Sequence, residues 1–227
     1  MYRLKPLRVF LLSALVLAPA SAAVIGISSP ASMTVTDTID WGAIGPDNTM
    51  TASSFNIQTT GGATVTVSNL DLDIGNMFRQ EQSGSWSGNF SPGDAVLFLY
   101  GEDAPLTLAF ASPVAAVGAN IQGNEYGPFE GTISVYGIGN NLLGSYTRTG
   151  DSNGAGDGSA IFLGMVSDGV DIYFARFSIE RADYLDFGIN QVLLGGEGSA
   201  SAPIPEPSTW ALLGAGLGWV VYRRGRA

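Results

Sequence analysis

The residues with the clearest capacity for metal chemistry lie in one Gly-rich stretch, residues 151–158. Asp151, Asn153 and Asp157 place oxygen ligands at short spacing there, and calcium prefers such ligands. The stretch departs from the EF-hand pattern, because apolar residues occupy two of the positions that need oxygen ligands. Gly, Asn and Asp are also the residues that an ordinary hairpin loop needs for its turns. We therefore favour a hairpin loop, keep calcium as the alternative, and expect no other cofactor.

Two aromatic residues, Trp86 and Tyr126, lie in polar, loop-like stretches of the sequence. Loops carry binding residues more often than the elements they connect. The apolar C–H faces of sugar rings stack on such side chains, so both residues are candidates for contact with a glycan. The alternative, which we prefer, is that each ring packs over one end of the domain.

Catalysis has few routes in this chain. The sequence contains no Cys and no His, which excludes thiolate nucleophiles, Ser-His-Asp centres and zinc sites built from these residues. Carboxylate pairs remain, such as Asp71 with Asp73 or Glu102 with Asp103, and glycoside hydrolysis uses two carboxyls about 5–10 Å apart. Because accidental pairs are common in an acid-rich chain, we expect no enzyme and keep a secreted glycosidase as the weakest alternative.

Charge is distributed unevenly along the 227 residues, which carry a net charge of −10. Six of the 10 Lys and Arg residues lie near the two ends, whereas residues 24–204 contain 19 of the 20 Asp and Glu residues. DNA affinity depends on many cation–phosphate contacts, so no nucleic-acid partner is expected.

The middle of the chain, residues 24–194, predicts a single all-β domain of the β-sandwich or jelly-roll type. Short stretches rich in Val, Ile, Thr and aromatic residues alternate with turn residues at the spacing typical of these folds. The expected strands are residues 32–38, 53–59, 63–68, 95–100, 106–110, 115–122, 132–137, 142–147, 159–165, 171–179, 184–189 and 191–194. A linker rich in Gly and Ser follows, at residues 195–204.

The N-terminal residues 1–23 have the three parts of a secretory signal peptide. Arg3, Lys5 and Arg8 form a basic region, an apolar run follows at residues 9–17, and small residues suit signal peptidase cleavage before Ala23 or Val24. The apolar run is too short to span a membrane. We therefore expect an N-terminal signal helix that is removed during export through the general secretion machinery.

The C-terminal residues 205–227 form a second tripartite pattern. Pro205, Glu206 and Pro207 precede an apolar run at residues 210–222, and the basic cluster Arg223, Arg224 and Arg226 follows. The run predicts a short apolar helix of marginal length for a membrane, with the Arg cluster retained on the cytoplasmic side. The prolines hold the first segment extended, the conformation that a processing protease needs.

This second pattern resembles the PEP-CTERM sorting signal. The resemblance implies that Pro205, Glu206 and Pro207 form a motif recognised by an exosortase, a membrane-embedded protease or transpeptidase. It also implies export across the inner membrane of a Gram-negative bacterium that makes exopolysaccharide. The protein would be anchored transiently through its C-terminal helix and then reach the cell surface or the extracellular matrix.

Residues 113–194 resemble, more loosely, a β-sandwich common in PEP-CTERM proteins. The matching features include the apolar stretches at residues 113–118, 133–136 and 172–179. Where that group often has an Asp-Asn pair, this chain has Asn190 followed by Gln191, so an acidic ligand is not carried over. We expect a non-enzymatic structural or adhesive protein. The alternative is a carbohydrate-binding module for exopolysaccharide, assisted by calcium.

Overall fold

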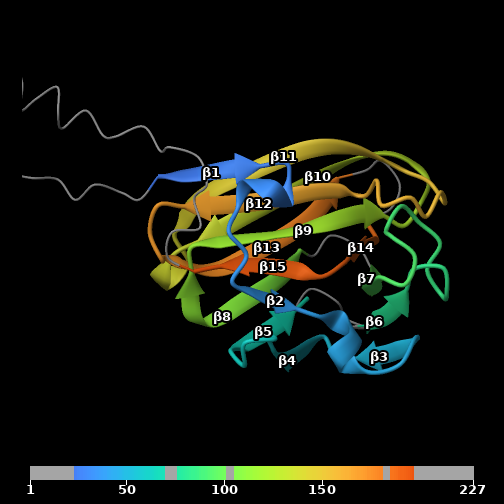
Figure 1. Cartoon of the computed structure of the whole chain (residues 1–227), viewed down its shortest axis with the longest axis horizontal. Helices are drawn as coiled ribbons and strands as arrows, with labels where there is room; N and C mark the ends of the chain where they lie inside the picture. The colour runs from blue at the N-terminus through green and yellow to red at the C-terminus, as the bar shows by residue number, and fades with distance from the viewer. Residues whose placement is uncertain (1–22, 70–75, 101–104, 181–184, 197–227) are drawn as a thin grey trace, which may run out of the picture.

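The chain folds into two antiparallel sheets, as shown in Figure 1. The structure is a computed structural model that describes residues 23–69, 76–100, 105–180 and 185–196. The larger sheet has nine strands. Seven of them lie in the order β1 (Val24–Ile27), β12 (Ile161–Ser167), β9 (Ala116–Gly123), β14 (Phe187–Ile189), β7 (Ala95–Tyr100), β6 (Asn76–Glu81) and β3 (Thr49–Thr51). The other two are β15 (Val192–Gly195), which pairs with β9, and β2 (Asp37–Ile39), which pairs with β15. The smaller sheet has six strands in the order β11 (Leu142–Ser152), β10 (Gly127–Tyr136), β13 (Ile172–Glu180), β8 (Leu106–Val114), β5 (Thr64–Ser68) and β4 (Ser54–Gln58).

Helical structure is limited to three short 3₁₀ turns within the described part of the chain. They are η1 (Pro30–Ser32), η2 (Trp41–Ile44) and η3 (Ile138–Asn140). No helix among the described residues is long and apolar enough to cross a membrane. The expected signal helix and the C-terminal apolar helix lie outside the described residues.

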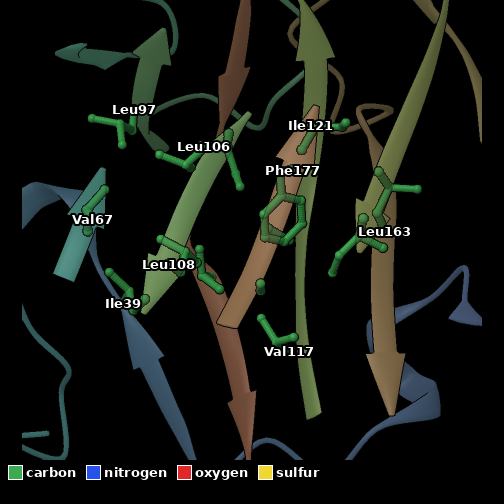
Figure 2. Packing of buried hydrophobic residues seen from close by; sticks show 14 of the residues in the cluster. Ile39, Val67, Leu97, Leu106, Leu108, Val117, Ile121, Leu163 and Phe177 are labelled. Carbon is green, nitrogen blue, oxygen red and sulfur yellow. The ribbon is translucent and has the colours of Figure 1, made fainter. Parts of the chain in front are cut away.

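One apolar core joins the two sheets, which makes the domain a β-sandwich. Strand alternation directs Val65 and Val67 of β5 inward, and Leu97 and Leu99 of β7 meet the same core from the other sheet. Figure 2 shows Phe177 of β13 packed among side chains of both sheets. These side chains are almost completely buried, which removes their apolar surface from water and stabilises the fold.

Most of the expected strands are present, with shifted boundaries. Residues 32–38 are the exception, because η1 takes the start of this stretch and β2 begins only at Asp37. Strands β1, β3 and β6 were not expected from the sequence pattern. Strands β10 and β11 are longer than expected, and β11 includes Asp151.

A break at Asn190 divides the path beside β9 into β14 and β15. The Asn190 Oδ1 atom accepts a hydrogen bond from the Asn120 N–H (3.0 Å), and its Nδ2 donates to Asp94 (3.2 Å). Its carbonyl accepts one from Nε1 of the fully buried Trp41 (2.8 Å). Asn190 thus joins three neighbouring segments, and its hydrogen bonds give it a structural role.

The strand register brings both ends of the described domain to the same end of the sandwich. Ile25, Val166, Ala116 and Gly195 are neighbours in one row across β1, β12, β9 and β15. Adjacent strands lie about 4.8 Å apart, so the outer members of this row are about 14 Å apart. Strand β9 then runs about 24 Å to Gly123 at the opposite end of the domain. Figure 1 shows β1 at the left of the molecule and β6 and β7 at the right.

Candidate functional site

The site begins with a strand that is apolar on both faces. In β7, Leu97 and Leu99 face the core between the sheets, whereas Val96 and Phe98 lie in a second apolar cluster on the outer face. Residues 82–94 connect β6 to β7 and contribute to that cluster, and we call them the covering segment. An outer face of this composition needs a cover, because exposed apolar surface costs free energy.

Trp86 supplies much of this cover. Its side chain is 4% exposed, and its ring lies 5.2 Å from the Phe98 ring and 6.2 Å from the Phe90 ring. Gly188 of β14 leaves room for the indole, since a Cβ atom there would lie 3.0 Å from Trp86 Cζ2. Most of the indole is therefore packing surface on the outer face of β7 and β14, and glycan contact by Trp86 stays a prediction.

Tyr126 occupies a different position, and its side chain is 54% exposed. It lies in the turn after β9, and its hydroxyl donates a hydrogen bond to the Ser87 carbonyl (3.3 Å). This bond ties the turn to the segment that carries Trp86. Tyr126 is thus held against the covering segment while about half of its surface faces solvent.

An open groove of about 530 Å³ brings these two residues together. Its aromatic lining consists of Trp86, Phe98, Tyr100 and Tyr126, and we call it the aromatic groove. Tyr100 ends β7, is 58% exposed and has its ring 6.2 Å from the Phe98 ring. The aromatic groove therefore has a buried aromatic floor and two exposed tyrosine rings.

Polar side chains line the rest of the aromatic groove. Gln80 comes from β6, Asn124 and Glu125 from the turn after β9, and Ser85 and Ser87 from the covering segment. Amides and hydroxyls both donate and accept hydrogen bonds, whereas an ionised carboxylate only accepts them. This combination of flat apolar rings with donors and acceptors suits a polyhydroxylated ligand.

The covering segment is fastened at its far side by two buried amide side chains, Asn89 and Gln122. The Asn89 N–H donates to Gln122 Oε1 (2.5 Å), and Gln122 Nε2 donates to the Asn153 carbonyl (3.1 Å). Asn89 Oδ1 accepts from the Asn153 N–H (2.7 Å), and its Nδ2 donates to Ser159 Oγ (2.7 Å). We call this set the cross-loop bridge. It joins the covering segment to residues 153–160, far away in the sequence.

Asp47 fastens the near side of the covering segment. Its carboxylate accepts hydrogen bonds from the Ser85 N–H (3.0 Å) and from the Ser85 hydroxyl, and Arg79 lies 3.8 Å away. Burial raises the pKa of Asp47, but these contacts and the Asn48 N–H outweigh burial and hold the pKa below its ordinary value. The carboxylate is therefore ionised at neutral pH and holds Ser85 at the rim of the aromatic groove.

The candidate calcium ligands do not all line one hollow. Asp151 pairs with Pro128 in the strand register, and it lines a shallow surface depression with Asn153 that Asp157 does not line. Asn153 Oδ1 accepts from the Ala155 N–H (2.8 Å), as is usual where Asn shapes a turn. Among the described residues, no group of three or more acidic side chains is arranged to hold a metal ion. Calcium at this loop stays a prediction.

Asp157 also bonds within its own loop. Its carboxylate accepts a hydrogen bond from the Ser159 N–H (3.0 Å). Hydrogen bonds from the Ser159 hydroxyl and N–H lower the pKa of Asp157 below its ordinary value.

Several other sequence candidates lie outside the described residues. These are the two carboxylate pairs, the processing motif and the terminal Arg cluster: Asp71, Asp73, Glu102, Asp103, Pro205, Glu206, Pro207, Arg223, Arg224 and Arg226. In contrast, the structure adds groove residues that the sequence did not single out. Tyr100 is the most important of them, and its only signal in the sequence was an aromatic residue at the end of an apolar strand.

Comparison with known proteins identifies the C-terminal region. Residues 203–226 match the PEP-CTERM protein-sorting motif. No curated protein sequence matches the chain. A crystal structure of a DUF4465 family protein from Bacteroides caccae ATCC 43185 resembles the chain with a TM-score of 0.38 and 11% identity, over 75% of this chain and 99% of that one. A similarity at this level carries no inference about function. A PEP-CTERM motif marks an exported protein that is anchored in the membrane by its C-terminal end and then processed by an exosortase. The chain therefore carries a PEP-CTERM sorting motif that follows a β-rich domain in the sequence.

Proposed function

We propose that the processed protein acts as a non-enzymatic structural or adhesive component of the cell surface or extracellular matrix of a Gram-negative bacterium. The observation that carries this proposal is the sorting motif at residues 203–226, together with the signal peptide expected at residues 1–23. The β-sandwich suits such a role, because its antiparallel ladders and the apolar core between its sheets form one stable body.

The arrangement of the chain ends also supports this role. The last described strand, β15, ends at Gly195, beside Ala116 at the start of β9. The aromatic groove is formed by the turn after Gly123, about 24 Å further along β9. A domain held through its C-terminal tail would therefore present the aromatic groove away from its attachment.

The processing proposal is tested in cells that contain an exosortase. Glu206→Ala in the full chain should leave the protein at full length in the membrane fraction, whereas the unaltered protein is shortened and found outside the inner membrane. Glu197→Ala is the matched control, because it removes a carboxylate from the preceding linker and not from the motif. Equal processing of both variants would contradict the role of the motif.

A second candidate function is binding of exopolysaccharide. One observation favours it: Trp86 and Tyr126 line a single groove with the exposed Tyr100. A glycan array probed with the exported protein, first with calcium and then with a chelator, tests this candidate. Saturable binding that is lost on chelation would also support calcium at Asp151, Asn153 and Asp157.

A further inference from the structure

We propose that the aromatic groove binds an uncharged glycan chain, with Tyr100 and Tyr126 as its two stacking platforms. This inference rests on the carbohydrate-binding candidate above and assigns it a site, contact residues and a ligand class. The observation behind it is the contrast within the lining: Trp86 and Phe98 are 4% and 8% exposed, whereas Tyr100 and Tyr126 are 58% and 54% exposed.

The two tyrosines are suited to stacking because they are exposed on rigid supports. Tyr100 is the last residue of β7, next to Phe98 in the outer apolar cluster. The Tyr126 hydroxyl is bonded to Ser87, and Gly154 lies so close that a Cβ atom there would come within 2.5 Å of the hydroxyl oxygen. A tyrosine held in this way offers a flat apolar surface at little further cost in conformational entropy.

The polar lining matches the hydroxyl groups of a sugar. Gln80 and Asn124 each present both a donor and an acceptor, and Glu125 presents acceptors, so hydroxyls of either hydrogen-bonding sense find partners. The groove is open to solvent and not enclosed, which suits a segment of a longer chain better than a small ligand that must be surrounded. Its size is within the range of ordinary ligand sites.

Charge indicates that the glycan is uncharged. Glu125 is the one charged residue among the described residues that line the aromatic groove, and residues 24–204 contain 19 acids against four Arg residues. An anionic polymer would approach a surface of its own sign, which lowers its association rate and its affinity. A neutral chain meets no such barrier.

The test is affinity electrophoresis of the exported protein in gels that contain β-glucan, xylan or galactomannan, with alginate as the anionic comparison. We expect retardation by at least one neutral polysaccharide and none by alginate. Tyr100→Ala and Tyr126→Ala should each weaken binding about tenfold, a factor that corresponds to about 1.4 kcal/mol. Tyr136→Ala is the matched control, because this tyrosine lies on the other sheet, beneath Arg176, and should bind like the unaltered protein.

Each contrary result overturns a specific part of the inference. Neutral glycan binding that survives both groove variants would keep the carbohydrate function and reject this site. Retardation by alginate alone would reject the ligand class. No retardation in any gel would reject both, while leaving export and processing to be judged by the Glu206→Ala experiment. Aromatic grooves also dock proline-rich peptides, so preferential binding of a peptide of residues 202–207 would likewise overturn the inference.

Discussion

Replacing Asn89 with alanine should loosen the covering segment without altering the aromatic groove residues themselves. The Asn89 side chain is almost fully buried and makes two hydrogen bonds, to Ser159 Oγ and from the Asn153 N–H, both of 2.7 Å. Asn89→Ala removes both of these bonds at once. The backbone bonds of the segment remain, among them Asn89 N–H to Gln122 Oε1 and Gly156 N–H to the Gly88 carbonyl.

The magnitude follows from these two bonds. An intramolecular hydrogen bond contributes about 1 kcal/mol net, so the free energy of unfolding should fall by about 2 kcal/mol. For a domain of this size, that loss corresponds to a melting temperature lower by about 4–8 °C. Asn56→Ala is the control, because Asn56 is exposed on the edge strand β4 and its side chain accepts a hydrogen bond from Thr66. This control should change the free energy of unfolding by about 0.5 kcal/mol or less.

Urea unfolding of the exported protein measures the global effect, and amide hydrogen exchange measures the local one. The Gly156 N–H donates to the Gly88 carbonyl (2.7 Å) across the two loops, so it reports whether they stay together. In Asn89→Ala this amide should exchange faster by a larger factor than amides of β9. Exchange at Gly156 equal to that in Asn56→Ala would refute the idea that the cross-loop bridge holds the covering segment.

Three further substitutions probe other parts of the structure. Trp41→Phe removes the 2.8 Å hydrogen bond to the Asn190 carbonyl and part of a buried ring. Urea unfolding should therefore show a free energy of unfolding lower by about 2 kcal/mol, and a decrease of less than about 0.5 kcal/mol would contradict this expectation. Burial raises the pKa of Asp37, but hydrogen bonds from its neighbours outweigh burial and lower the pKa overall. The ionised carboxylate therefore stabilises the fold above about pH 4, and this stabilisation is lost as the pH falls through the folded-state pKa. Asp37→Asn should therefore lower the urea midpoint at pH 7 and have a smaller effect as the pH falls below about 4, and an effect that does not shrink with falling pH would be inconsistent with this sign. Gly188→Ala would place a Cβ atom 3.0 Å from Trp86 Cζ2, so it should lower the free energy of unfolding by about 1–3 kcal/mol and alter the near-ultraviolet circular dichroism. An unchanged spectrum would show that the indole does not lie over β14.

The strands that the sequence predicted well are those whose pattern has a single cause. In β5, apolar Val65 and Val67 alternate with Thr side chains because one face meets the core, and the alternation can be read directly. Strand β6 was not predicted because Arg79 interrupts its apolar pattern. This arginine is 7% exposed yet lies beside Asp47 and Glu81, two partners that no local pattern identifies.

The candidate site was predictable in residue type but not in assembly. The sequence drew attention to Trp86 and Tyr126 as aromatic residues in polar surroundings, and both line the aromatic groove. It gave no sign that Tyr100 joins them, because the groove combines three segments that only the register of β6, β7, β14 and β9 brings together. It also could not show which residues Trp86 packs against, since its neighbours Phe98 and Gly188 come from β7 and β14.

The position of the chain ends has a mechanical consequence. A pull between the C-terminal attachment at Gly195 and a polymer held at the opposite end of the sandwich acts along the strands. The hydrogen bonds of antiparallel ladders lie perpendicular to the strands, so such tension loads the ladders of β15 with β9 and β2 together in shear. Peeling, which breaks ladder bonds one after another, would require force applied across the strands. Under the proposed attachment and glycan binding, tension would therefore run in the direction along which antiparallel ladders resist extension best.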